Sequence, residues 1–163
     1  MTEDEKSEQC KEVYAHAGLA LYWGQCLEKS LENFLTLHAR ASGECVTLAE
    51  LDALDEHVEA QTLGRLLADT RKRVRFEKRA KELLAAALER RNFLAHHFFK
   101  ERAETFMSRA GRDQMIAELD EICERFRRAD VVASVICKAL QKVLGISDEL
   151  IEQEFQRLAK HDT

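Results

Sequence analysis

The chain contains no proline and only six glycines among its 163 residues. A β-sandwich or β-barrel of this size would need many turns, and turns depend on these two residues. Their scarcity, beside abundant Ala, Leu, Glu, Lys and Arg, favours helices instead. We therefore expect an all-α fold. At this length we expect a single domain covering residues 1–163, large enough to bury a core without covalent staples.

The cysteines are odd in number, widely scattered and form no Cys-x-x-Cys pair, which argues against a disulfide framework and a zinc site. The acidic, polar segment Met1–Lys6 does not resemble a signal peptide, and no apolar run approaches the roughly 20 residues that span a membrane. These features predict a cytoplasmic protein with reduced thiols and no membrane segment. The net charge of −5 provides no overall attraction to nucleic acid, so any RNA site must be a local basic patch.

Apolar residues recur at steps of three and four along three long segments, which is typical of helices packed in a bundle. We expect helices from about Glu5 to about Arg40, from about Arg71 to about His97, and from Asp113 to about Leu144. Gly24 lies on the first apolar stripe and indicates a close helix crossing. Gly111 is expected to interrupt the chain before the third helix, and Gly145 to cap its end. The expected stripe of that helix runs from Met115 to Val143.

Shorter elements fill the remaining sequence. Thr47 and Glu50 have the spacing of a capping box, which predicts a helix from about 48 to 58. Residues 61–67 are expected to be helical or irregular, with a bend at Gly64. A last helix, about 148–160, should bury Ile151, Phe155 and Leu158. Together these elements predict an up-and-down bundle of four to five helices with its core at about 10–145. The long stripes could equally form a dimer seam.

The segment Arg91-Asn92-Phe93-Leu94-Ala95-His96 contains groups suited to phosphate chemistry. Asn92 and His96 lie four residues apart on one helix face, and the Arg91 side chain is long enough to curl toward His96. A guanidinium can hold a phosphate through two hydrogen bonds, and an imidazole can move a proton near neutral pH. The alternatives are structural: Arg91 pairs with a core carboxylate, Glu89 or Glu28, and His96 is a core histidine.

The phrase from Leu88 to Phe99, in its helical context, resembles the signature of HEPN domains: an arginine, a polar residue directly after it, and a histidine four to six residues on. This resemblance implies a homodimer that brings two motifs together across a two-fold axis. It implies a metal-independent endoribonuclease without a cofactor, in a toxin–antitoxin or phage-defence setting, that acts on RNA and pairs with an antitoxin or immunity protein. By position, Arg91 would bind the scissile phosphate, His96 would transfer protons, and Asn92 would orient one of them.

Two further features refine the resemblance. Some HEPN toxins carry a nucleotide-accepting tyrosine two residues after the motif histidine, whereas this chain has Phe98, which has no hydroxyl. Other HEPN domains have lost catalysis and bind a partner protein or RNA, which is our second hypothesis.

A run of basic residues precedes the motif, and it is either a solvated helix face or a track for the RNA backbone. The arginines at 125, 127 and 128 could extend this track. His96 and His97 diverge by about 100° on a helix, so they do not chelate a metal together. The candidate RNA-binding residues are Arg71, Lys72, Arg73, Arg75, Lys78, Arg79 and His97.

Overall fold

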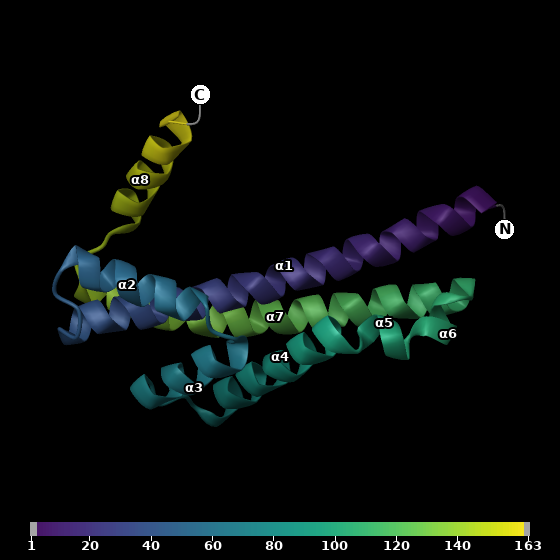
Figure 1. Ribbon diagram of the computed structural model, residues 1–163, viewed down its shortest axis with the longest axis horizontal. Coiled ribbons are helices and arrows are strands. Elements are labelled where there is room, and N and C mark those ends of the chain that lie inside the picture. Colours follow the sequence, from purple (N-terminus) through teal and green to yellow (C-terminus); the bar gives the residue numbers. More distant parts are fainter. Residues whose placement is uncertain (1–2, 162–163) are drawn as a thin grey trace.

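The computed structural model describes the backbone of residues 3–161 and the side chains of residues 5–157. This part of the chain is all-α and contains eight helices and no strand, so the all-α prediction is confirmed. Three of the helices are long, and five shorter ones connect or follow them (Figure 1). The count exceeds the expected four or five because connections that sequence reasoning left irregular are themselves helical.

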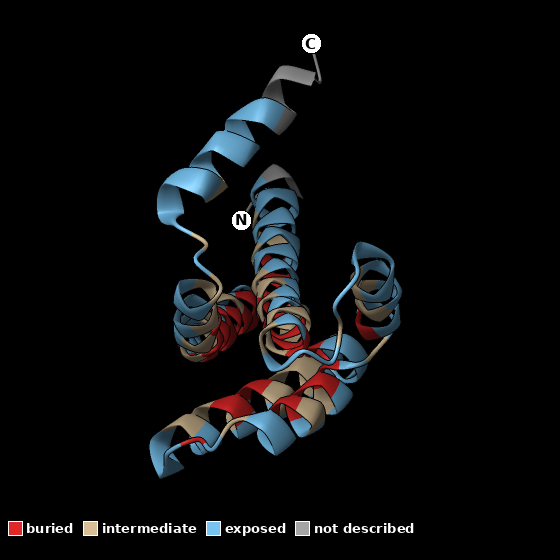
Figure 2. Cartoon of the chain, turned by 90° about the vertical axis from the view of Figure 1, so that its left-hand side faces the viewer, coloured by how far each residue is buried: buried red, intermediate tan, exposed pale blue. Residues whose placement is uncertain are grey.

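The long helices α1 (Glu3–Ser42) and α7 (Arg109–Val143) lie side by side and run in the same direction (Figure 1). Gln9 near the start of α1 bonds Asp113, and Ser30 farther along bonds Asp130. Helix α4 (Lys78–His96) runs in the opposite direction. Its Arg91 pairs with Glu28 of α1, and Phe99, just beyond the end of α4, contacts the earlier residue Tyr14. These three helices enclose most of the core, which appears as the buried interior in Figure 2.

The expected stripes account for the packing of α1 on α7. Gly24 is buried, and a Cβ built on it would lie 3.5 Å from the Phe126 ring, which confirms the close crossing. Phe34, Leu119 and Phe126 are almost fully buried, as the spacing predicted. The prediction fails at the end of α7, where Val143 is exposed because no helix covers that last turn.

Helix α2 (Leu48–Glu59) begins with the predicted capping box. The Glu50 amide donates to Thr47 Oγ1 at 3.3 Å, and the Thr47 amide donates to Glu50 Oε2 at 2.9 Å. The Glu50 carboxylate also accepts from the Val46 amide, and these backbone donors lower the pKa of Glu50. The reciprocal bonds satisfy amides that the first helical turn leaves unpaired, so the helix starts at a fixed residue.

Two predicted boundaries are wrong between α2 and α4. Gly64 does not form a bend, since it lies inside α3 (Leu63–Arg73), where buried Leu63, Leu66 and Leu67 hold the helix against the core. The helix expected from Arg71 begins only at Lys78. Residues 74–77 are not helical, because the linker is drawn inward to bury Phe76.

Two further predictions are corrected after α4. The helices α5 (Phe98–Glu101) and α6 (Ala103–Phe106) lead into α7, whose first turn contains Gly111 rather than being interrupted by it. Ser108 caps that turn by accepting from the Gly111 amide at 3.0 Å. Helix α8 (Asp148–His161) points away from the bundle (Figure 1), so Phe155 is exposed instead of buried. The Leu158 side chain lies outside the described residues.

Candidate functional site

Arg91 joins α4 to α1 through an ion pair. Its Nε donates to Glu28 Oε1 at 3.0 Å, and the two side chains are 31% and 19% exposed. Of the two carboxylates that the sequence offered as partners, the structure selects Glu28. The terminal nitrogens of Arg91 form no hydrogen bond with any described residue. The guanidinium is therefore anchored on one edge and open on the other.

A small cleft of about 100 Å³ lies beside this ion pair, between α1, α4 and α7. Gln25, Glu28 and Arg91 are its polar lining residues, and Leu21 and Phe126 belong to its apolar lining. His96 does not line it. His96 lies five positions after Arg91, which places their side chains about 140° apart around the helix axis. The Arg91 side chain reaches toward α1 instead of curling along α4 to the His96 of its own chain.

Asn92 and His96 lie on the solvent-facing side of α4, as does Glu89. Neither Asn92 nor His96 forms a side-chain hydrogen bond with a described residue. The interpretation of His96 as a core histidine is therefore wrong, because its imidazole is exposed. His97 is also exposed; its ring centroid lies 6.3 Å from that of His96, and its Nδ1 lies 4.0 Å from Glu101 Oε1.

The basic run that precedes the motif is split between two helices. Arg71, Lys72 and Arg73 end α3, whereas Lys78 and Arg79 begin α4 at the end opposite His96, about 27 Å away along the helix. All of these residues are exposed, and so is Arg75 in the linker. Acidic partners offset part of the charge, since Lys72 Nζ lies 2.7 Å from Asp69 and Arg73 lies 3.7 Å from Glu44.

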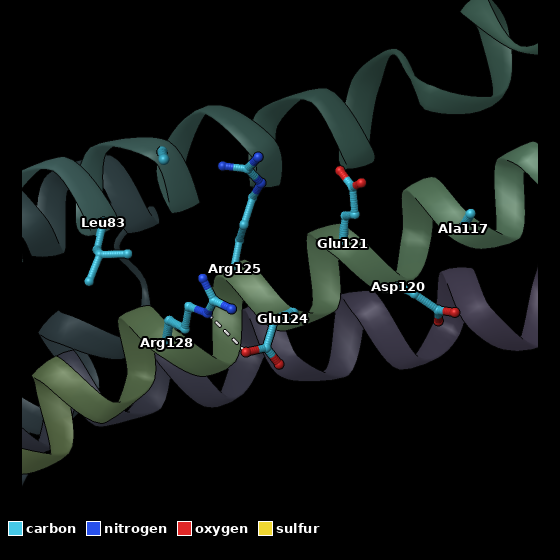
Figure 3. Close-up of a pocket in the computed structure, with 8 residues that line it drawn as sticks. Leu83, Ala117, Asp120, Glu121, Glu124, Arg125 and Arg128 are labelled. Carbon is cyan, nitrogen blue, oxygen red and sulfur yellow. Dashed lines mark hydrogen bonds and ion pairs between the residues drawn. The ribbon is translucent and has the colours of Figure 1, made fainter.

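Two of the three α7 arginines that were candidates for extending this run, Arg125 and Arg128, line a larger groove instead. The groove lies between α4 and α7 and has a volume of about 480 Å³. In Figure 3, Arg125 and Glu121 extend toward α4, and Arg128 bonds Glu124, with 2.9 Å between Nε and Oε1. Arg127 lies elsewhere, with its guanidinium 4.6 Å from the Trp23 ring centroid. Carboxylates thus alternate with cations in the groove, which makes it a poor site for a polyanion.

Sequence reasoning missed the most deeply buried charged residue, Arg112. Its Nε donates to Gln9 Oε1 at 2.8 Å, and its Nη1 donates to the Phe106 carbonyl at 2.9 Å. The signal was available, because Arg112 lies three residues before Met115 and continues the apolar stripe of α7. This guanidinium connects α1, the end of α6 and the start of α7, and so acts in the fold.

The described residues contain no group of three or more His, Cys, Asp or Glu side chains that could hold a metal ion. All five cysteines are free, and burial raises the pKa of the Cys137 thiol to about 11. None of the described helices has a stretch both long and apolar enough for a bilayer. No protein-family model matches the chain, and comparisons with curated proteins and with solved structures find no significant match. The fold therefore defines an all-α protein, and the motif and its surroundings carry the functional argument.

Proposed function

We propose that the chain is a HEPN-like, metal-independent endoribonuclease whose active site is completed by a second copy. The observation that carries this proposal is the division of the motif. Arg91 presents open donors beside a cleft, whereas His96 and Asn92 stand unpaired on the outer side of α4. An unpaired imidazole on a helix surface is available to groups arriving from outside the protomer.

The reaction needs two proton transfers and stabilisation of negative charge. One His96 imidazole removes the proton of the ribose 2′-hydroxyl, whose oxygen attacks the adjacent phosphorus. The P–O5′ bond breaks, a 2′,3′-cyclic phosphate remains, and the same imidazole, now protonated, gives its proton to the leaving 5′-oxygen. The open donors of Arg91 stabilise the charge on the phosphoryl oxygens. Asn92, which lies one turn before His96, orients the imidazole or the phosphate.

The surface around the motif supports association of two copies. Tyr14 and Leu21 on α1 and Phe99 beyond α4 are large apolar residues exposed to solvent, and the rings of Tyr14 and Phe99 lie 5.8 Å apart. Leu21 also lines the cleft at Arg91. Exposed apolar residues around a polar centre are typical of protein interfaces. A homodimer through this face would place the His96 of one protomer near the Arg91 of the other.

The ion pair sets a condition on phosphate binding. Glu28 cancels much of the Arg91 charge within the cleft, so a phosphate would meet a nearly neutral pair and depend on directed hydrogen bonds. The substrate in this proposal is RNA, and the setting is a toxin–antitoxin or phage-defence system with an antitoxin or immunity protein as partner. The proposal keeps the basic residues at the α3–α4 junction as a peripheral RNA contact.

One observation favours a second candidate, a non-catalytic helical module that binds a protein or RNA. The Arg91–Glu28 pair crosslinks α4 and α1 at a half-buried position, which by itself accounts for an arginine on an apolar stripe. In that case Arg91→Ala lowers stability, and the exposed imidazole has no chemical role.

The deciding experiment measures cleavage of RNA in the presence of a chelator. We expect His96→Ala and Arg91→Ala to abolish cleavage, and His57→Ala, the matched change at an exposed histidine of α2, to retain it. Thermal unfolding of each variant separates lost chemistry from lost structure. If no RNA is cut by the wild type, or if His96→Ala cuts as well as His57→Ala, the nuclease proposal fails and the binding module remains.

A further inference from the structure

The second half of α7 presents an apolar surface that nothing in the described chain covers. Val131 and Val135 are 63% and 61% exposed. With Arg128, Lys138 and Lys142 they occur at steps of three and four, so all five side chains share one helix face, and all are exposed. We call these five residues the α7 face. It consists of an apolar pair flanked by three cations.

Helix α8 has the complementary chemistry. Leu150 and Phe155 are 55% and 65% exposed, so the helix has apolar side chains without a partner. Its described charges are mainly carboxylates, and the first turn contains Asp148 and Glu149. A helix of this length is marginal in water unless an apolar face is packed. The apolar side chains of α8 therefore need a docking surface.

The connection between α7 and α8 sets the direction in which α8 leaves. Gly145 has φ +71° and donates to the Lys142 carbonyl at 3.2 Å, and Ile146 donates to the Gln141 carbonyl at 2.9 Å. This pair of bonds is a Schellman closure. The Leu150 amide then donates to Ser147 Oγ at 3.3 Å, which fixes the start of α8. With both sides of the short connection hydrogen-bonded, α8 points away from the bundle (Figure 1), and only its first turn, at Asp148 and Glu149, lies beside Lys138 and Lys142 of its own chain.

We propose that α8 docks on the α7 face of a second copy, and that the exchange is reciprocal. Phe155 and Ile151, which lie four residues apart on one face of α8, would pack on Val131 and Val135 of the other copy, and the exposed carboxylates Glu152 and Glu154 would meet the cations of that α7 face. The dimensions agree, because α8 and the span from Arg128 to Lys142 each measure about 21 Å along the helix axis.

This interface is separate from the face that carries Arg91 and His96, and it does not rest on the nuclease proposal. It uses residues after 127 only, whereas the motif face uses α4, α5 and residues 14–28 of α1. The two associations can therefore be tested independently.

The test measures the mass of the full-length protein in solution by light scattering across a range of concentrations. We expect Val135→Asp and Phe155→Asp each to halve the mass of the wild-type assembly. Val46→Asp, a matched change at a valine that is 66% exposed in the α1–α2 connection, should leave it unchanged. If the wild type is a dimer, the substitutions leave monomers. If the motif faces also associate and the wild type is a tetramer, they leave dimers, so the mass is halved in either case. RNA cleavage should not depend on either substitution.

Mixing the two variants gives the sharper result. Phe155→Asp retains an intact α7 face and Val135→Asp retains an intact α8, so an equimolar mixture regains one of the two contacts and forms a mixed assembly. A wild type that is monomeric at all concentrations would overturn the proposal. Variants that keep the wild-type mass, or a mixture that does not reassociate, would overturn it too.

Discussion

The Gly111→Ala substitution tests how α7 is joined to the segment before it. A Cβ at this position would lie 1.9 Å from the Thr105 carbonyl oxygen and 2.8 Å from Ser108 Oγ. The first of these atoms is backbone, so it cannot turn aside as a flexible side chain can. The α6–α7 connection would have to retreat by about 1 Å to reach the shortest separation that real Cβ atoms show.

The expected magnitude follows from two opposing effects. Forcing extra atoms into a packed site costs about 1–3 kcal/mol and sometimes more. Alanine gains at most about 1 kcal/mol over glycine in a helix, and less in the first turn, where fewer helical bonds are made. The Gly111 backbone does not have a positive φ, so no conformational strain is added. We expect the free energy of unfolding to fall by about 2 kcal/mol.

Gly24→Ala is the matched control, because a Cβ there would meet the Phe126 ring at an ordinary contact distance of 3.5 Å. We expect this variant to be as stable as the wild type, or more stable by up to about 1 kcal/mol. Urea unfolding followed by circular dichroism gives the free energy of unfolding of both variants, provided that its slope against urea concentration is the same as in the wild type. If Gly111→Ala unfolds at the same urea concentration as Gly24→Ala, the close approach to Thr105 is not a constraint on the fold.

Three further predictions concern buried groups and the ion pair. Arg112→Met should lower the free energy of unfolding by about 3 kcal/mol in the same urea assay, because it removes the donors that reach Gln9 and the Phe106 carbonyl from a fully buried site; stability within 0.5 kcal/mol of wild type would refute this role. Burial raises the pKa of Cys137 from 9.0 to about 11, so the folded state holds this proton more tightly than the unfolded state does. The resulting stabilisation is full below pH 9 and falls as the pH approaches 11. The free energy of unfolding of Cys137→Ala should therefore fall less than that of the wild type between pH 9 and pH 11. Equal slopes of this free energy against pH would contradict the prediction. Glu28→Gln should increase the affinity of RNA for the protein, measured by fluorescence anisotropy, because the Arg91 charge is no longer offset; unchanged affinity would argue that Arg91 does not contact phosphate.

The sequence was informative where packing repeats along a helix. The stripes through Leu27, Phe34 and Phe126 located two of the three long helices and their buried sides, and the Thr47–Glu50 pair located the start of α2. It was misleading at glycines, since Gly64 and Gly111 lie inside helices. A glycine has several structural uses, and only the surroundings decide among them. At Gly111 the reason is the approach of Thr105, which sequence spacing does not reveal.

The candidate site shows a similar division. For Arg91 the sequence left two interpretations, a phosphate ligand or a pair with Glu89 or Glu28, and the structure contains the pair with Glu28. Spacing along one helix did not indicate that the guanidinium would reach across to α1 and leave His96 on another side of α4. The partner of a long side chain depends on which helix packs beside it, and that is fixed by the tertiary arrangement. The same limit explains why α8 was expected to be buried: its pattern reports an apolar face but not what covers it.

Complementation between two inactive variants tests the shared active site most directly. Arg91→Ala retains His96, and His96→Ala retains Arg91, so a mixed pair of protomers contains one complete site of the two. We predict that the mixture cuts RNA in the presence of chelator, up to about half the wild-type rate per pair, while each variant alone does not. A mixture as inactive as its components, beside an active wild type, would contradict a site divided between two copies.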